Sequence, residues 1–243
     1  NGYKEIVLTG VDLTSYGSDL PGQPSLGNMA GRLLKHVPDL KRLRLSSLDP
    51  VEIDADLLKL IGNEQRLMPH LHLSIQAGDN MILKRMKRRH LRNDVIDIAK
   101  QLRDIRPDIV LGADLIAGFP TETDTMFRQS LDLISEIELI HLHVFPYSAR
   151  EGTPAAKMPQ VPQAIRKSRA AILRKAGQNM LHQYLNGCIG RSERVLVEKD
   201  SVGRTEHFIP MNVKNSTGPG EIINATVTSA TMTELHGSYE RQS

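Results

Sequence analysis

The sequence is poor in several residue types, and each scarcity limits what the protein can do. Its 243 residues include a single cysteine, Cys188, and no tryptophan. One thiol cannot form an intrachain disulfide, which fits a reducing compartment, and it cannot by itself hold a zinc ion or a thiolate-ligated cluster. No run approaches the roughly 18 apolar residues of a membrane span, and the N-terminus shows no signal-peptide pattern. We therefore expect a cytoplasmic protein that does not enter a membrane.

The charge is mildly basic and unevenly distributed. The 31 Lys and Arg residues outnumber the 28 Asp and Glu residues, which leaves a net charge of +3. This balance permits nucleic-acid binding without indicating it. Basic residues gather at 84–92 and again at 166–175. For each cluster, a solvated helix face and a binding surface are both open interpretations.

Short apolar or alternating runs predict strands in the first part of the chain. Their first residues lie 28 to 39 positions apart, and helical patterns fill the gaps between them. Strands that alternate with helices predict an α/β fold with a parallel sheet. The first strand lacks a glycine-rich dinucleotide turn after it, which favours a partial (β/α) TIM-like barrel. The predicted strands are residues 5–9, 42–47, 70–75, 109–116 and 139–145.

The later part of the chain has a different pattern. Pro154, Pro159 and Pro162 mark a linker, and a helix rich in Arg, Lys and Ala follows to about Tyr184. Short strand candidates at 193–198, 207–213 and 222–228 then predict a small all-β barrel. We expect three parts: a partial barrel over 1–153, a linker and helix over 154–184, and a small β-barrel over 185–243.

Polar residues and glycines follow the predicted strands where each strand ends. Function in a parallel barrel lies at this edge, and polar groups there are costly unless they are paired. Turns and helix caps would explain any one position, but five strand ends together favour a polar ligand. His141 and His143 are two residues apart on the fifth strand and therefore point to the same face. Core or rim histidines are the simpler interpretation, and a metal-binding pair is the alternative. The candidate residues are Thr9, Gly10, Ser47, Glu52, Ser74, Gln76, Asp114, Phe145, Tyr147 and Arg150.

Four segments resemble signatures of one enzyme family. The segment LSIQAGDNMILKRMKRRH at 73–90 resembles the fourth-strand signature of the radical S-adenosylmethionine (SAM) methylthiotransferases. EIVLTGVDLTSYG at 5–17, DLIAGFPTET at 114–123 and FPYSAREGTPA at 145–155 resemble the second, fifth and sixth strands of the same family. Residues 185–243 look like a TRAM domain, a small RNA-binding barrel. The segments KRMKRRH at 84–90 and RPDIVLGAD at 106–114 are most similar in sequence to the branch of the family that acts on threonylcarbamoyladenosine in tRNA.

The resemblance implies a specific chemistry. Such enzymes bind a [4Fe–4S] cluster through three cysteines and cleave SAM to a 5′-deoxyadenosyl radical. A second cluster supplies sulfur, and the product is a methylthio group on C2 of the modified adenosine beside the anticodon. The implied cofactors are therefore SAM and [4Fe–4S] clusters of the full-length protein, and the implied partner is tRNA.

The resemblance also implies SAM contacts, although it assigns no catalytic residue. Thr9 and Gly10 would lie beside the methionyl end of SAM, with Ser47 and Glu52 near its ribose. The remaining implied contacts are hydrogen bonds from Ser74 and Gln76, a charge-assisted contact of Arg88 with the SAM carboxylate, and packing of Phe145 on the adenine.

The sequence departs from the family pattern in ways that shape the expectation. It lacks the cluster cysteines, so we expect a fragment without the first barrel strand that binds no cluster and is inactive alone. From Leu185 onward, the sequence contains six Lys and Arg residues and seven Asp and Glu residues, a net charge of −1. We therefore expect RNA affinity from the Arg88 and Arg169 regions, with Phe208 as the main stacking candidate in the barrel and Tyr239 in a tail. A non-catalytic RNA-binding remnant and an enzyme acting on a ribosomal-protein aspartate are the alternatives.

Overall fold

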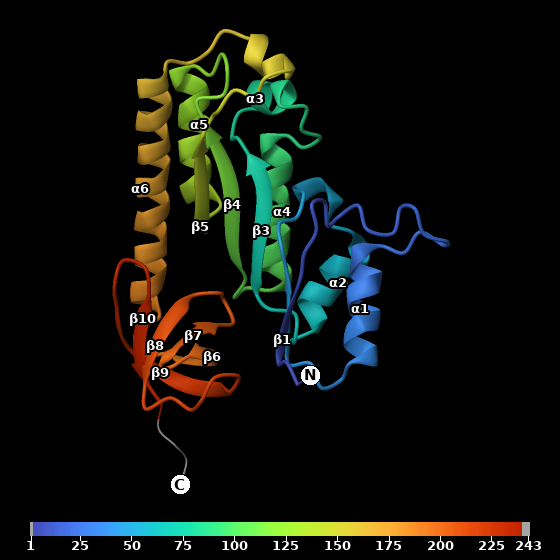
Figure 1. Ribbon diagram of the computed structural model, residues 1–243, viewed down its shortest axis with the longest axis vertical. Helices are drawn as coiled ribbons and strands as arrows, with labels where there is room; N and C mark the ends of the chain where they lie inside the picture. The colour runs from blue at the N-terminus through green and yellow to red at the C-terminus, as the bar shows by residue number, and fades with distance from the viewer. Residues whose placement is uncertain (1, 240–243) are drawn as a thin grey trace.

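Five parallel strands carry the larger part of the molecule (Figure 1). The computed structural model describes residues 2–239. Strands β1 and β2 pair with each other, and β3, β4 and β5 form a second sheet. Two isolated parallel bridges, Leu43 with Leu67 and Leu48 with Leu73, connect the two sheets. The strands are β1 (Glu5–Leu8), β2 (Arg42–Leu45), β3 (His70–Gln76), β4 (Val110–Ala117) and β5 (Leu139–Pro146). The α/β prediction is confirmed, and all five strands lie within a residue or two of the ranges predicted from the sequence.

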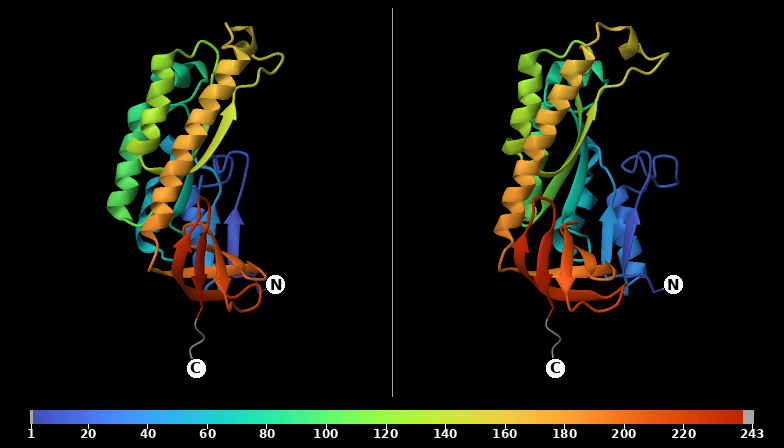
Figure 2. Two further views of the ribbon diagram at one scale, coloured as in Figure 1. Left: turned by 90° about the vertical axis from the view of Figure 1, so that its left-hand side faces the viewer. Right: turned by 60° about the vertical axis from the view of Figure 1, so that its left-hand side comes forward.

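Helices connect these strands and cover one face of the sheet (Figure 2). Most begin at a side chain that accepts a backbone N–H in the first turn, which is why they start where they do: Ser25, Asp54, Asp79 and Thr123 all act in this way. The helices are α1 (Leu26–His36), α2 (Ala55–Asn63), α3 (Asn80–Arg85), α4 (Arg92–Ile105), α5 (Asp124–Glu136) and α6 (Gln163–Gly187), with 3₁₀ turns η1 (Pro50–Glu52) and η2 (Pro154–Lys157).

The two faces of the three-stranded sheet differ sharply in polarity. On β3, the odd-numbered residues Leu71, Leu73 and Ile75 are almost fully buried, and all three belong to the main core under the helices. The even-numbered His70, His72, Ser74 and Gln76 point the other way, because side chains alternate along a strand. The covered face thus forms the core, and the uncovered face presents polar groups.

The small barrel closes from five short strands, β6 (Ser192–Lys199), β7 (Val202–Thr205), β8 (Pro210–Lys214), β9 (Ile222–Ala230) and β10 (Leu235–Ser238). The predicted barrel is confirmed, but β7 and β10 were not predicted. Its interior is filled by Val195, Met211, Val213 and Val227, which are essentially inaccessible. Tyr239 was expected in a tail. It is half-buried against this core, and its N–H donates to the carbonyl of Lys214.

Two buried arginines fix the small barrel to the N-terminal end of the sheet. Arg42 donates to the carbonyls of Arg204 and Arg194 at 3.1 and 2.7 Å, and Arg44 donates to those of Glu206 and Thr205, both at 2.8 Å. Figures 1 and 2 show the barrel below the strands, at the end opposite to α3 and η2. The C-terminal edge of the sheet is therefore left open.

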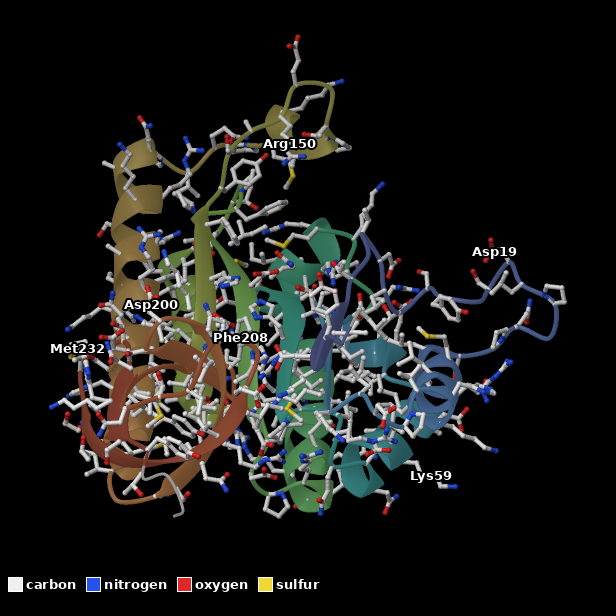
Figure 3. The ribbon with its side chains drawn as sticks, turned by 60° about the horizontal axis from the view of Figure 1, so that its bottom comes forward. Asp19, Lys59, Arg150, Asp200, Phe208 and Met232 are labelled. Carbon is white, nitrogen blue, oxygen red and sulfur yellow. The ribbon has the colours of Figure 1, made fainter. Side chains whose placement is uncertain are left out.

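Phe208 belongs to this junction and is not free to stack on a base. Figure 3 shows it on the side of the barrel that faces the strands. Its ring lies parallel to His70 with centroids 5.3 Å apart, and the guanidinium of Arg204 lies 4.3 Å from its centroid. The expectation that Phe208 is the barrel's stacking residue is wrong, because the protein's own side chains occupy the ring.

Candidate functional site

A polar cavity of about 600 Å³ opens at the C-terminal ends of β1, β2 and β3. The loop after β1 contributes Thr9 and Gly10, the loop after β2 contributes Ser47, and the end of β3 contributes Ser74. Arg88 reaches the same cavity from the segment after α3. Five of the eight SAM contacts expected from the sequence therefore line one cavity.

Arg88 enters this cavity already paired with protein groups. Its Nη2 donates to Asp49 Oδ2 at 2.9 Å and to the carbonyl of Ser74 at 2.8 Å. Burial disfavours the Asp49 carboxylate, but His90, the N–H of Val51 and the charge of Arg88 outweigh burial, so the pKa of Asp49 is lowered. Arg88 Nε is buried and has no partner among the described residues, whereas the side chain as a whole is 26% exposed, so a ligand would meet the outer part of the guanidinium.

Glu52 is absent from the residues that line the cavity. Its carboxylate is bound to Arg89 and accepts a hydrogen bond from Thr14. These contacts hold the loop after β1 against the segment after α3. Glu52 thus shapes the cavity wall from behind.

Gln76 and Phe145 line a second, more apolar cavity of about 490 Å³. Ile116 and Tyr147 add apolar surface to it, and Arg150 stands at its mouth, where Figure 3 shows it beyond the strand ends. Gln76 has a φ of 71°, in the left-handed region. That conformation accompanies a break in the pairing of β3 with β4 between Leu73 and Gln76.

Asp114 lies on the wall that the two cavities share. Its Oδ1 is 3.0 Å from His72 Nε2 on β3 and 3.2 Å from His143 Nδ1 on β5. Burial works against the ionised carboxyl, but both histidines outweigh burial and lower the pKa of Asp114. The sequence singled out Asp114 and His143 separately, and His72 only as part of an alternating run.

The two histidines of the fifth strand have different neighbours. His141 contacts the carbonyl of His207 in the small barrel at 3.0 Å, whereas His143 contacts Asp114. Burial lowers the pKa of His141 to about 4. His141 and His143 therefore do not converge on one point.

The basic cluster at 166–175 is largely structural. Arg169 is buried with Glu122 at 2.7 Å and also reaches Asp124 at 2.6 Å, while Arg166 and Arg174 donate to backbone carbonyls of the strand-exit region. Burial raises the pKa of Glu122 in spite of Arg169. Glu122 also accepts the N–H of Gly118, and this bond fixes the turn after β4. Arg169 itself is therefore not placed to contact RNA, whereas its neighbours Lys167 and Lys175 are exposed, so the RNA surface expected in this region stays a prediction.

The residues of the chain do not fit a thiolate-ligated cluster. The single cysteine, Cys188, is 1% exposed and lies in the core shared by the small barrel and the end of α6. Burial also raises the pKa of its thiol, which opposes the thiolate form that metals require. The cavities, in contrast, offer the hydroxyls, backbone groups and arginine that a ligand of SAM's size and polarity needs.

Comparisons with known proteins show the family to which the chain belongs. The radical SAM superfamily model matches residues 1–134. The chain is 56% identical, over 224 residues, to a threonylcarbamoyladenosine tRNA methylthiotransferase of Rickettsia prowazekii; the match covers 92% of this chain and 53% of that protein. It is 36% identical to a tRNA-2-methylthio-N(6)-dimethylallyladenosine synthase of Rickettsia rickettsii, over 98% of this chain and 56% of that protein. The chain thus spans about half the length of these curated relatives.

A solved structure shares the fold at low sequence identity. Coproporphyrinogen III oxidase from Escherichia coli, described as a radical SAM enzyme, superposes with a TM-score of 0.53 at 14% identity, over 96% of this chain and 58% of that one. At that identity the likeness shows the fold alone. Together with the matched family model, these findings show that the chain belongs to the radical SAM superfamily, and within it the chain is similar to the tRNA methylthiotransferases.

Proposed function

We propose that this chain is the SAM-binding and substrate-binding part of a methylthiotransferase that modifies C2 of N6-threonylcarbamoyladenosine beside the anticodon of tRNA. The observation that carries the proposal is the polar cavity, where five of the eight expected SAM contacts meet in a chain 56% identical to an enzyme of that name. Because the chain spans about half of that relative, the activity is proposed for a whole protein that contains it. Such an enzyme would work in the cytoplasm, on tRNA.

SAM would occupy the polar cavity. Gly10 leaves open space at the loop after β1, because a Cβ there would meet nothing closer than 3.8 Å. Ser47 and Ser74 offer hydroxyls, and the partly exposed guanidinium of Arg88 offers a charged donor to a carboxylate. In this family bound SAM supplies a carbon radical; the work of these residues is to hold SAM and limit its motion.

The modified base would occupy the second cavity. Phe145, Tyr147 and Ile116 supply the apolar and aromatic surface on which a base packs, and Gln76 can donate and accept hydrogen bonds at its edge. The threonylcarbamoyl group carries a carboxylate, and exposed Arg150 at the cavity mouth is the cation placed to meet it. A dimethylallyl group has no charge for Arg150 to recognise.

A segment exchange tests this proposal. The part of the Rickettsia prowazekii protein that aligns with this chain would be replaced by this chain. The chimera would be produced in a bacterial strain that lacks tRNA methylthiotransferases for both threonylcarbamoyladenosine and dimethylallyladenosine. Mass spectrometry of tRNA nucleosides would then report the products. We expect 2-methylthio-N6-threonylcarbamoyladenosine and no methylthiolated dimethylallyladenosine.

Two variants sharpen the test. Arg150→Ala should lower threonylcarbamoyladenosine modification at least tenfold, whereas Lys157→Ala, which removes a nearby cation outside both cavities, should leave it unchanged. A soluble chimera that modifies only dimethylallyladenosine, only a ribosomal protein or nothing at all would contradict the proposal. The last outcome, combined with tight tRNA binding, would favour a non-catalytic RNA-binding protein.

A further inference from the structure

Asp114 is a half-buried carboxylate without a permanent cation beside it. Its side chain is 22% exposed, and the only basic groups within 4 Å of it among residues 2–239 are the imidazoles of His72 and His143. Glu5, Asp49, Glu52 and Glu122 are buried to a similar or greater degree, and each faces an arginine within that distance. Buried charges in proteins are paired or coordinate a metal. The Asp114 site lacks the pairing that its neighbours have.

The three side chains come from adjacent parallel strands and point to the same face. Asp114 and His143 are register partners on β4 and β5, and His72 is paired with Gly112, two residues before Asp114. Gly112 makes the arrangement possible: a Cβ there would lie 2.7 Å from His72 Nδ1 and 2.9 Å from the Cβ of His141. The backbone of three strands therefore holds the cluster, and no loop contributes to it.

The geometry matches the requirements of a transition-metal ion. A tetrahedral ion with bonds of about 2.0–2.1 Å holds neighbouring ligand atoms roughly 3.3 Å apart. The two His–Asp distances are 3.0 and 3.2 Å, and all three ligand atoms lie within 4.8 Å of one another. Only the distance between the two imidazole nitrogens needs to shorten. The side chain of His143 is 65% exposed and can make that adjustment.

We propose that His72, Asp114 and His143 form a binding site for one divalent transition-metal ion, with zinc as the reference ion. Two imidazoles and one carboxylate are a ligand set suited to Zn²⁺ and Fe²⁺. Three protein ligands leave at least one position open, and Asp114, one of the three ligands, lines both cavities. An ion at this place would offer a coordination site to an oxygen or nitrogen of a molecule bound in either cavity.

Metal titration of the purified, tag-free chain tests the site directly. After chelator treatment, isothermal calorimetry with Zn²⁺ should show one ion per chain with a dissociation constant of about 1 μM or lower. Co²⁺ should produce the intense visible absorption of a four-coordinate ion. The titration needs neither SAM nor tRNA, so its failure would say nothing about the proposed methylthiolation.

Single-residue variants identify the ligands. His143→Ala removes a largely exposed ligand and should keep the fold, and Asp114→Asn keeps the shape of the side chain. Each should weaken Zn²⁺ binding at least a hundredfold. His36→Ala removes an exposed histidine on α1 and Cys188→Ser removes the only thiol, and both should bind as the parent does. Absence of saturable Zn²⁺ and Co²⁺ binding, or affinity that survives in His143→Ala and Asp114→Asn, would overturn the site.

Discussion

Replacement of Arg44 by methionine should loosen the small barrel from the sheet. The guanidinium is 2% exposed, donates to two barrel carbonyls at 2.8 Å, and lies 3.0 Å from a carboxylate oxygen of Glu5. Hydrogen bonds from charged groups contribute about 1.5–3 kcal/mol each. Methionine retains an apolar stem of similar reach, which offsets part of the loss. We therefore expect the free energy of unfolding to fall by about 2–4 kcal/mol.

Arg194→Met is the matched control. Arg194 also forms an ion pair in this region, with Glu206 at 2.8 Å, but its side chain is 50% exposed. Exposed pairs contribute about 0–1 kcal/mol, so this variant should remain within 1 kcal/mol of the parent. The contrast between the two variants isolates burial, because both remove one guanidinium from the same region of the molecule.

Urea denaturation followed by far-ultraviolet circular dichroism measures both variants, since the chain has no tryptophan to report by fluorescence. Hydrogen exchange at the amides of 204–208 would show whether the junction itself opens. If Arg44→Met lost no more stability than Arg194→Met, or if exchange rose equally throughout the molecule, the reasoning that buried arginines hold the barrel in place would be refuted.

Three further predictions concern stability. Gly112→Ala should cost about 1–3 kcal/mol in a urea titration, because its Cβ would meet His72 and the backbone of β5, whereas Gly187→Ala, with nothing within 4 Å, should not destabilise. The pKa of His141 is lowered to about 4 in the folded chain from the 6.5 of an exposed imidazole, so the unfolded chain binds the extra proton first as the pH falls. Stability should therefore fall by up to about 3 kcal/mol as the pH drops from 6.5 to 4 in urea titrations, and His141→Gln should flatten that slope. Asp54→Ala should cost about 1–2 kcal/mol by thermal denaturation, since Asp54 caps α2 and also accepts the N–H of Gly27 in α1.

The sequence predicted the order of strands and helices because those signals are local. A period of two or of 3.6 residues survives in any window long enough to contain it, and the caps at Ser25 and Thr123 are equally local. The missed elements are the short ones. Helix α3 has six residues, and strands β7 and β10 have four each and contain a glycine, so no period could be read. Their existence depends on the neighbours they pair with.

The candidate site was predicted in part for a similar reason. Thr9, Gly10, Ser47, Ser74 and Arg88 could be placed on one edge because parallel strands end together. The sequence did not reveal that Glu52 pairs with Arg89, or that Arg169 is buried against Glu122. These partners are far apart in the chain, and sequence patterns do not show which distant charged residues meet in the fold. Alternation on three strands in parallel register would have brought His72, Asp114 and His143 together, provided that the register was known.

The uncovered face of β3, β4 and β5 changes character along the strands, and this change indicates how ligands enter. At the N-terminal end, His70 and His141 lie against Phe208 and are buried beneath the small barrel, where burial keeps the pKa of both imidazoles low. One level further along, the His72–Asp114–His143 cluster is partly open, and at the C-terminal end the face opens into the two cavities. Because the barrel covers the N-terminal end and the helices cover the other face, the two cavities that a ligand could occupy lie toward the C-terminal edge of the sheet.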